Sequence, residues 1–513
     1  MDSKILSAKG ICKNFGAVHA LKNVSFDMEP AQIHCLVGEN GSGKSTFVKV
    51  VAGVYTPDAG LLTLNGHDYP QGCTVREAIR EGIQVIYQDL SLFPHMSVAE
   101  NIAANSIAAQ REGIVRWNKI QEMAAVQLQR IGVSLDLNTK VENISIANRQ
   151  LVAICRALCQ DAKIIFMDEP TTALTRKEIN QLISIVLDLK KEGISVVFIS
   201  HKLDEVMEVA DQIAIFRDGE KVGDFPSREI NETKLIRYMT GKEYIYTRYE
   251  RNRTEETPVI KADNLGRKGN YKGIQFEVRP GDILGVTGLL GSGRTEMALS
   301  LFGLNPYDEG TLLIEGKKQN FHSSTRAIRA GISLVPENRQ TQGCYMSRNI
   351  TDNVSSTILD KVKNKIGFLN RHLMIEKAEK TINSLNVVTE NANTILQNLS
   401  GGNAQKVVLG RWIATSPKVL ILDSPTVGVD IGAKAEIYEK IQRLADEGMA
   451  IILISDELQE ILANCNRLLI MRNGNEVALL GENELQQKDI AETIYNLMYS
   501  EESKYEKPEE SVC

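Results

Sequence analysis

A glycine-rich stretch near the start of the chain has the residue types of a phosphate-binding loop. Apolar residues 33–37 precede it as a predicted strand, and residues 46–51 follow it as a predicted helix. Glycines let consecutive backbone N–H groups converge on phosphate oxygens, and a helix N-terminus adds a favourable potential. In such a loop the lysine neutralises phosphate oxygens, and the hydroxyl after it ligates Mg²⁺. The residues predicted to bind a nucleotide are Gly38, Glu39, Asn40, Gly41, Ser42, Gly43, Lys44, Ser45 and Thr46.

Two adjacent carboxylates follow the apolar run 164–167. Asp168 ends this predicted buried strand, where a carboxylate can hold Mg²⁺ or its waters, and Glu169 can polarise an attacking water. A helix cap at the strand end is the plain alternative, since Pro170 starts a turn. The phosphate loop upstream favours the catalytic interpretation.

Gln88 and His201 also follow predicted strands. A histidine at a strand end can hydrogen-bond a γ-phosphate, although alone it is more often structural. Gln88 alone indicates little. Their order along the chain, after a phosphate loop and on either side of the acidic pair, gives both residues more weight.

The chain that carries these residues is a tandem repeat. A second glycine loop, 288–295, lies 250 positions after the first, and Asp423 lies 255 positions after Asp168. Ser455-Asp456 matches Ser200-His201 at the same spacing of 255. Two copies of one domain therefore lie head to tail, with about five extra residues in the second copy.

Each copy has the pattern of an α/β domain. Strand-like alternation leads to a glycine loop and a helix, and a helical stretch follows at about 99–132 in the first copy and 367–386 in the second. We predict a first domain over 1–243, a polar surface linker over 244–258, a second domain over 259–500 and a charged tail over 501–513.

The composition excludes several classes of protein. The 513 residues are 43% apolar and 24% charged, with a net charge of −6, so a disordered chain and a global attraction to nucleic acid or anionic lipid are both excluded. No apolar run reaches the roughly 18–20 residues of a membrane helix. The N-terminus lacks the apolar core of a signal peptide, and the eight cysteines are scattered, which favours reduced thiols in the cytosol.

The order of phosphate loop, glutamine, Ser-Gly-Gly element, Asp-Glu pair and histidine resembles the ATP-binding-cassette ATPases. The Ser-Gly-Gly element is Ser400, Gly401 and Gly402, which opens a predicted helix 23 residues before Asp423. Residues 144–150, 288–296 and 428–434 look like those of the duplicated ATPase subunits of bacterial sugar importers, the ribose, galactose, xylose and autoinducer-2 group. This resemblance covers nearly the whole chain.

The resemblance implies an α/β fold of two tandem ATP-binding-cassette domains, each a P-loop NTPase core with a mixed sheet and an inserted helical subdomain. It implies an ATPase that uses ATP and Mg²⁺ to energise import of a sugar or sugar-like solute. The implied partners are two integral-membrane permease subunits and, indirectly, an extracytoplasmic solute-binding protein, with no nucleic acid. The implied location is the cytoplasmic face of the cell membrane.

In this family each ATP site joins the phosphate loop of one copy to the signature element of the other. The resemblance makes Glu169, His201, Lys44 and Gln88 catalytic, and assigns the metal to Ser45, Gln88 and Asp168. Phe15 falls where the family stacks an aromatic on adenine, although it could also be a core residue. Ser400, Gly401 and Gly402 complete this first site, and Asp430 resembles an aspartate that approaches it.

The second site has lost catalytic residue types. Ser424 replaces the glutamate, Asp456 the histidine, Glu337 the glutamine and, by the spacing of 250, Leu265 the aromatic. Across from it, Ile146 and Ala147 follow Ser145 in place of the glycine pair. Its expected nucleotide-binding residues are Gly288, Gly291, Ser292, Gly293, Arg294 and Thr295. We expect this site to bind nucleotide and to hydrolyse it poorly or not at all, since serine is a poor base and Asp456 adds negative charge.

Three alternatives stay open at this stage. The stretch 91–97 is either a docking surface for the permease or a plain packing turn. The chain as a whole could instead be a soluble tandem cassette acting on ribosomes or other nucleic acid assemblies. It could also be a regulatory binding module without catalysis. The short linker and acidic charge disfavour the second alternative, and the intact first site disfavours the third.

Overall fold

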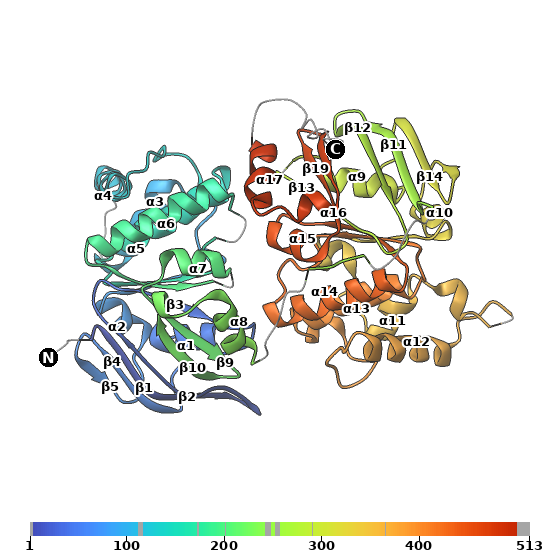
Figure 1. Cartoon of the computed structure of the whole chain (residues 1–513). Coiled ribbons are helices and arrows are strands. Elements are labelled where there is room, and N and C mark those ends of the chain that lie inside the picture. Colours follow the sequence, from blue (N-terminus) through green and yellow to red (C-terminus); the bar gives the residue numbers. More distant parts are fainter. Residues whose placement is uncertain are drawn as a thin grey trace. The chain divides into compact units, whose positions relative to one another are not determined.

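The computed structural model describes residues 4–110, 116–171, 174–200, 202–241, 248–251, 257–289, 291–364 and 366–499, without the side chains of 107–110 and 176. The chain divides into two compact units, Met1–Tyr244 and Ile245–Cys513. Each unit has its own sheets and helices, coloured along the sequence in Figure 1.

The first unit contains two sheets. An antiparallel sheet has the strand order β2-β1-β4-β5, formed by β1 (Leu6–Phe15), β2 (Val18–Met28), β4 (Ala59–Leu64) and β5 (His67–Tyr69). The central sheet has the order β10-β9-β3-β8-β7-β6, formed by β3 (Ile33–Val37), β6 (Ile83–Ile86), β7 (Ile164–Asp168), β8 (Ser195–Ile199), β9 (Gln212–Arg217) and β10 (Glu220–Pro226). Its strands are parallel except β10. Every residue of β3 and β8 is buried, which fits their largely apolar sequences, interrupted by His34 and Ser195.

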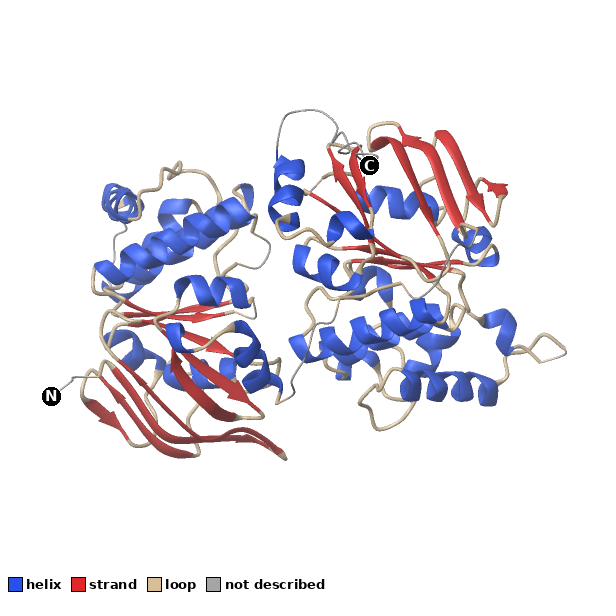
Figure 2. Ribbon diagram, viewed as in Figure 1, coloured by secondary structure: helices blue, strands red, loops and turns tan. Residues whose placement is uncertain are grey.

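Helices lie on both sides of the central strands (Figure 2). They are α1 (Lys44–Val51), α2 (Val75–Arg80), α3 (Val98–Gln110), α4 (Trp117–Arg130), α5 (Ile146–Leu158), α6 (Arg176–Lys191), α7 (Leu203–Val209) and α8 (Glu232–Thr240), with single turns at Val141–Asn143 and Ser227–Glu229. Helices α3, α4 and α5 share a small apolar core that includes Ile102, Leu128 and Val152. These three helices form the inserted helical subdomain that the sequence predicts.

The second unit repeats this plan with one continuous sheet. Its order is β15-β14-β11-β12-β20-β19-β13-β18-β17-β16. The strands are β11 (Ile260–Arg267), β12 (Tyr271–Val278), β13 (Ile283–Gly288), β14 (Glu309–Ile314), β15 (Lys317–Gln319), β16 (Ile332–Val335), β17 (Val419–Asp423), β18 (Ala450–Ile454), β19 (Arg467–Arg472) and β20 (Asn475–Leu480). A pairing of Lys272 with Asn475 joins the two halves of the sheet. The mixed-sheet α/β fold is thus confirmed in both copies.

The helices of the second unit match those of the first in order. They are α9 (Arg294–Leu301), α10 (Ser324–Arg329), α11 (Ile350–Ser355), α12 (Arg371–Ser384), α13 (Gly401–Ile413), α14 (Ile431–Asp446), α15 (Leu458–Asn464), α16 (Glu482–Leu485) and α17 (Ile490–Tyr499), with short turns at Arg339–Gly343, Leu359–Val362 and Leu396–Asn398. Within the described part of the chain, none of the helices combines the length and apolar character needed to cross a bilayer.

Part of the predicted linker belongs to the second unit. Of residues 244–258 the structure describes 248–251 and 257–258, and the tail 501–513 lies outside the described residues. Tyr249 is only 5% exposed, and its hydroxyl donates to the carbonyl of Gly281 at 2.9 Å. Arg251 lies 3.2 Å from the carboxylate of Asp282. One aromatic ring and one ion pair therefore anchor residues 249 and 251 of the predicted linker to the second unit, while Glu250 is exposed.

Candidate nucleotide-binding sites

The first glycine loop joins the end of β3 to the start of α1, and its backbone requires glycine at two points. Gly38 has a φ of 153°, and a side chain there would meet the carbonyl oxygen of Phe216 at 2.2 Å. Gly43, the N-cap of α1, has a φ of 104°, and a side chain there would meet the carbonyl oxygen of Ala20 at 2.7 Å. Because neither position tolerates a Cβ, the loop is held as a tight turn that directs backbone N–H groups to one side.

The polar side chains of this loop lie where an anion would bind. Lys44 donates from Nζ to the carbonyl oxygens of Gly38 at 2.6 Å and Glu39 at 2.9 Å. Its ammonium group therefore lies over the loop. Ser45, in the first turn of α1, is exposed. This arrangement places a positive charge and a hydroxyl together at a helix N-terminus, the chemistry that a polyphosphate requires.

The acidic pair lies at the end of β7, beside β8. Asp168 pairs with Ile199, and the N–H of Glu169 donates to the carbonyl of Ile199 at 2.9 Å. Glu169 has a φ of 49°, so the chain turns sharply at the residue that carries the predicted base. Gln88 Nε2 donates to Glu169 Oε2 at 3.3 Å, so the structure brings these two sequence-predicted residues together. Burial, with Glu169 nearby, raises the pKa of Asp168, while Lys44 acts in the opposite direction.

Two further residues complete the first-unit predictions. His201 lies outside the described residues. Phe15, at the tip of the β1–β2 hairpin, is 43% exposed, which is unlike a core phenylalanine. Its ring meets that of Tyr55 edge-on at 5.1 Å, and Lys13 Nζ lies 5.6 Å from its centroid. Tyr55 and Lys13 thus contact the Phe15 ring, which is still exposed enough for another ring to stack on it.

The Ser-Gly-Gly element forms the start of α13. Ser400 is the N-cap, and its Oγ accepts from the N–H of Asn403 at 3.4 Å. A Cβ on Gly402 would lie 2.4 Å from that of Ala433, so the next helix requires glycine here. That helix, α14, is capped by Asp430, which accepts from Ala433 N–H at 2.8 Å. The exposed Ser400 and the free N–H groups of the first helical turn form a second anion-binding geometry.

The corresponding element of the first unit keeps the cap and loses the glycines. Ser145 caps α5 by accepting from the N–H of Asn148 at 3.2 Å. Ile146 follows it and is 49% exposed. A branched apolar side chain thus stands where the second unit has Gly401.

The second glycine loop keeps the backbone of the first. Gly288 has a φ of 157°, and a Cβ there would lie 2.0 Å from the carbonyl oxygen of Met471. Gly293 is the N-cap of α9, with a φ of 91°. Gly291 also has a positive φ, of 80°. A nucleotide-binding backbone is therefore present in the second unit, beside the side chains Ser292 and Thr295.

The charges around the second loop differ from the sequence-based expectation. Arg294 is only 8% exposed, and its Nη2 lies 2.5 Å from Oδ1 of Asp456. Its Nη1 donates to the carbonyl of Ser455 at 3.4 Å. Asp456 therefore does not stand as an isolated negative charge, because the arginine that replaces the loop lysine is its partner. The spacing of the repeat singled out both residues as substituted positions but gave no sign that they pair.

The end of β17 has the backbone conformation found at Glu169, but Ser424 supplies no carboxylate at that position. Ser424 has a φ of 47° and donates from its N–H to the carbonyl of Ile454 at 2.9 Å, as Glu169 does to Ile199. Asp423, before it, is 3% exposed. Burial raises the pKa of Asp423 to about 6, and Glu337 acts in the same direction.

Strand register corrects one correspondence between the copies. Leu265 pairs with Ile274 in the β11–β12 hairpin, as Ile11 pairs with Val24 in the β1–β2 hairpin. Leu265 is fully buried and so corresponds to Ile11, not to Phe15. The spacing of 250 failed because the hairpin of the second copy turns after Arg267 and is four residues shorter. The aromatic position is therefore absent from this hairpin, rather than occupied by leucine.

One residue near the signature element was missed. Arg339 donates from Nη1 to the carbonyl of Gly401 at 2.8 Å, and burial lowers the pKa of its guanidinium. It lies in a short turn, 339–343, that follows the end of β16. No feature of the sequence connects it with α13, 62 positions away.

Comparison with known proteins agrees with these motifs. The ABC transporter family model matches twice, at residues 21–172 and 271–427. The chain is 39% identical to the "Putative ribose/galactose/methyl galactoside import ATP-binding protein 2" of Rhizobium meliloti (strain 1021), over 95% of each chain. It is 38% identical to the ribose import ATP-binding protein RbsA of Geobacillus kaustophilus (strain HTA426), over 95% of this chain and 98% of the relative.

A crystal structure of a nucleotide-free ATP-binding cassette from an ABC transporter is 26% identical and covers 47% of this chain and 100% of that chain, with a TM-score of 0.42. The assignment itself rests on the family model, which matches two segments that each begin before a glycine loop and end after an acidic strand. The chain therefore belongs to the ABC transporter family, as an ATPase with two ATP-binding cassettes in tandem.

Proposed function

We propose that this chain is the ATP-hydrolysing subunit of an importer for a sugar or sugar-like solute. Its partners would be two integral-membrane permease subunits and, indirectly, an extracytoplasmic solute-binding protein, and it would act at the cytoplasmic face of the membrane. The relatives are named as sugar import ATP-binding proteins, and they match this chain over almost their whole length. Both findings support this proposal.

The two ATP sites are proposed to be unequal. The first phosphate loop would work with Ser400, Gly401 and Gly402 as one competent composite site, and the second loop would face the Ser-Ile-Ala element as a degenerate site. The observation that carries this asymmetry is the pair Gln88–Glu169, joined at 3.3 Å at the end of β7. The same backbone position in the second unit holds Ser424, which has no carboxylate to act as a base.

The first site also fits a Mg²⁺ ion. Ser45 offers an exposed hydroxyl, Gln88 an amide oxygen and Asp168 a carboxylate whose burial favours a cation beside it. Oxygen donors of these kinds, together with phosphate oxygens, are the usual ligands of Mg²⁺ in nucleotide sites. The bound ion would supply positive charge that offsets the phosphates.

The chemistry assigned to the chain is positioning and charge stabilisation. Glu169, held by Gln88, would orient the attacking water and accept its proton. Lys44 would stabilise negative charge that develops on the γ-phosphoryl group, as would His201 and the N–H groups at Ser400. Nothing in this scheme requires a covalent intermediate on the protein.

The decisive test is the Mg-ATPase activity of the full chain in membranes that carry its permease. Glu169→Gln is expected to lower turnover by at least about 10²-fold, the usual loss for a general base, whereas Ser424→Glu changes it little. Substantial activity in Glu169→Gln would show that the working site is wrongly assigned.

An exposed aromatic residue supports permease docking at 91–97. Phe93 is 51% exposed, although the buried Asn101 fixes its backbone by accepting from Phe93 N–H at 2.8 Å and donating to its carbonyl at 3.0 Å. The second unit repeats this device with Tyr345, 56% exposed, and Asn353. Each cassette thus has an exposed ring on a backbone that a buried asparagine fixes, which suits a surface that binds a segment of a partner protein.

Phe93→Ala is expected to reduce co-purification with the permease and solute uptake while leaving ATP binding unchanged. Val126→Ala, at a site that is 53% exposed on α4, is the matched control. Equal loss of uptake in both variants would contradict docking at 91–97.

A further inference from the structure

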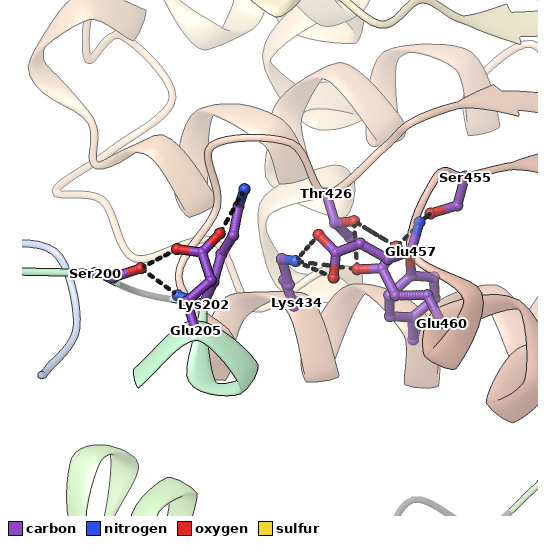
Figure 3. Close-up of polar contacts among 9 residues, drawn as sticks. Ser200, Lys202, Glu205, Thr426, Lys434, Ser455, Glu457 and Glu460 are labelled. Carbon is purple, nitrogen blue, oxygen red and sulfur yellow. Dashed lines mark hydrogen bonds and ion pairs between the residues drawn. The ribbon is translucent and has the colours of Figure 1, made fainter. Parts of the chain in front are cut away.

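A buried carboxylate ties together the two strand ends that carry the first site. Glu205, on α7, is 1% exposed. Its Oε2 accepts from Thr171 Oγ1 at 2.6 Å. The same oxygen accepts from Ser200 Oγ at 3.2 Å, and Lys202 Nζ lies 3.2 Å from Oε1 (Figure 3). Because a buried carboxylate is costly unless it is paired, these contacts strongly favour one arrangement of the three segments.

The residues that Glu205 holds flank the predicted catalytic positions. Thr171 lies two residues after Glu169, and Ser200 lies one residue before His201. Ser200 Oγ also accepts from the N–H of Lys202 at 3.1 Å. The carboxylate of Glu205 is therefore bonded to the chain next to the predicted base and next to the predicted γ-phosphate donor, although nothing in the sequence motifs includes it.

The second unit has the same contact with additional partners. Glu460 accepts from Thr426 Oγ1 at 3.0 Å and from Ser455 Oγ at 2.8 Å (Figure 3). Tyr438 donates to it at 2.5 Å, and Lys434 Nζ lies 3.1 Å away. We call this arrangement, a buried glutamate bonded to one threonine and one serine, the clasp. The second unit has the clasp although it lacks the catalytic glutamate and histidine types. The second clasp therefore serves as an internal control for a purely structural role.

We infer that Glu205 is a positioning residue for ATP hydrolysis, which ties the chain just after Glu169 to the end of β8 through Thr171 and Ser200. This inference rests on the proposal that the first cassette hydrolyses ATP. A shift of about 1 Å in a catalytic group can cost about 10²-fold in rate, so a clasp that bonds both flanking segments has leverage on turnover. The phosphate loop and Phe15 make no described contact with Glu205, so ATP binding should not depend on it.

The experiment compares Glu205→Gln with Glu460→Gln in the full chain, in membranes with the permease. Glutamine keeps the shape but loses the charge, because an amide oxygen that accepts from Thr171 and Ser200 leaves an NH₂ group facing the Lys202 ammonium. Glu205→Gln is expected to lower kcat by about 10-fold to 100-fold with KM for ATP within about twofold of wild type. Glu460→Gln is expected to lower the melting temperature at least as much, because it also loses Lys434 and Tyr438, yet to leave kcat within about twofold.

Equal losses of kcat in the two variants, or a rise in KM that accounts for the loss in Glu205→Gln, would overturn the inference. If Glu205→Gln does not fold, Thr171→Val and its counterpart Thr426→Val decide in the same way, since each replaces the hydroxyl that donates to the glutamate with a methyl group of similar size. Glu169→Gln, measured alongside, separates a failure of the proposed working site from a failure of the clasp. Retained activity in that variant refutes the proposed working site, whereas its loss together with an ineffective Glu205→Gln refutes the clasp alone.

Discussion

At the scale of single residues, the two glycine loops differ mainly in where their positive charge is directed. Lys44 lies over its loop, whereas Arg294 is directed to Asp456 at 2.5 Å. A nucleotide at the second loop would have to share the guanidinium with this carboxylate or displace it. We therefore expect the ion pair to weaken phosphate binding at the second loop without removing the cation.

Asp456→Asn is expected to tighten nucleotide binding at the second loop. The substitution removes one negative charge and frees Arg294 for the phosphates, a change of about 1–2 kcal/mol or roughly 5-fold to 30-fold in affinity. Fluorescent ATP analogue titration in a Lys44→Ala background, which weakens the first site, measures it. Glu457→Gln, at the next residue, is the control, and an unchanged affinity in Asp456→Asn would show that the pair does not compete with nucleotide.

Asp423 gives a pH-dependent stability prediction. Burial raises its pKa in the folded chain to about 6, above its value in the unfolded chain, so its protonated form is favoured by folding. The associated stability is present below about pH 4 and is lost as the pH rises through about 6. Asp423→Asn is therefore expected to stabilise the nucleotide-free chain at about pH 7.5, by about 2–3 kcal/mol, with the difference vanishing near pH 4.

Denaturant unfolding in EDTA at several pH values checks this expectation. EDTA matters because a divalent cation beside the carboxylate would reverse the sign. Asp423→Asn being less stable than wild type at about pH 7.5 would mean that Arg294 and Thr295 outweigh the cost of burial.

The sequence predicted the identities of these residues but not their pairing. Repeat spacing located Arg294, Asp456 and Ser424 as replacements, and the structure places all three at the predicted strand and loop ends. The Arg294–Asp456 pair joins residues 162 positions apart, and the Thr171–Glu205 contact involves residue types that are common everywhere. Such contacts depend on side-chain direction, which spacing does not specify.

At the scale of elements, the hairpins at the start of each unit differ at the position proposed to stack on adenine. The longer β1–β2 hairpin extends to Phe15, which pairs with Val18 at its tip, whereas the β11–β12 hairpin ends at the pair Arg267–Tyr271. Sequence alternation predicted both pairs of strands. It could not predict the shift of four residues, because both strands keep the same apolar faces on either side of it.

Phe15→Ala is expected to weaken ATP binding at the first site by about 1–3 kcal/mol, or roughly 5-fold to 150-fold, the usual contribution of one base–aromatic stack. Phe15→Tyr should retain most of the affinity, since it keeps the ring. Equilibrium binding of ATP to the Arg294→Ala chain isolates the first site. An effect on GTP and ATP that leaves CTP untouched would support stacking further, and an unchanged ATP affinity would place adenine elsewhere.

At the scale of the whole molecule, duplication has kept two folds and one full set of catalytic residue types. The second unit retains its sheet, its glycine loop and the clasp at Glu460, which are the parts that stability requires. It also retains Ser400 with both signature glycines, which in this family serve the other cassette. The residue types missing are those proposed to act on nucleotide at its own loop, which favours specialisation of the second unit over general decay.

This division of labour predicts the stoichiometry of a single turnover. When the full chain, in membranes with its permease, is loaded with radiolabelled ATP and allowed one closure, about one ADP per chain should form, because only the first site has a base. Ser424→Glu should not raise the yield to two, since Asp456 still pairs with Arg294 and the shorter β11–β12 hairpin has no counterpart of Phe15. Two ADP per chain in the wild type would contradict the asymmetry, because it would require a base at the second site that is supplied by some residue other than Ser424.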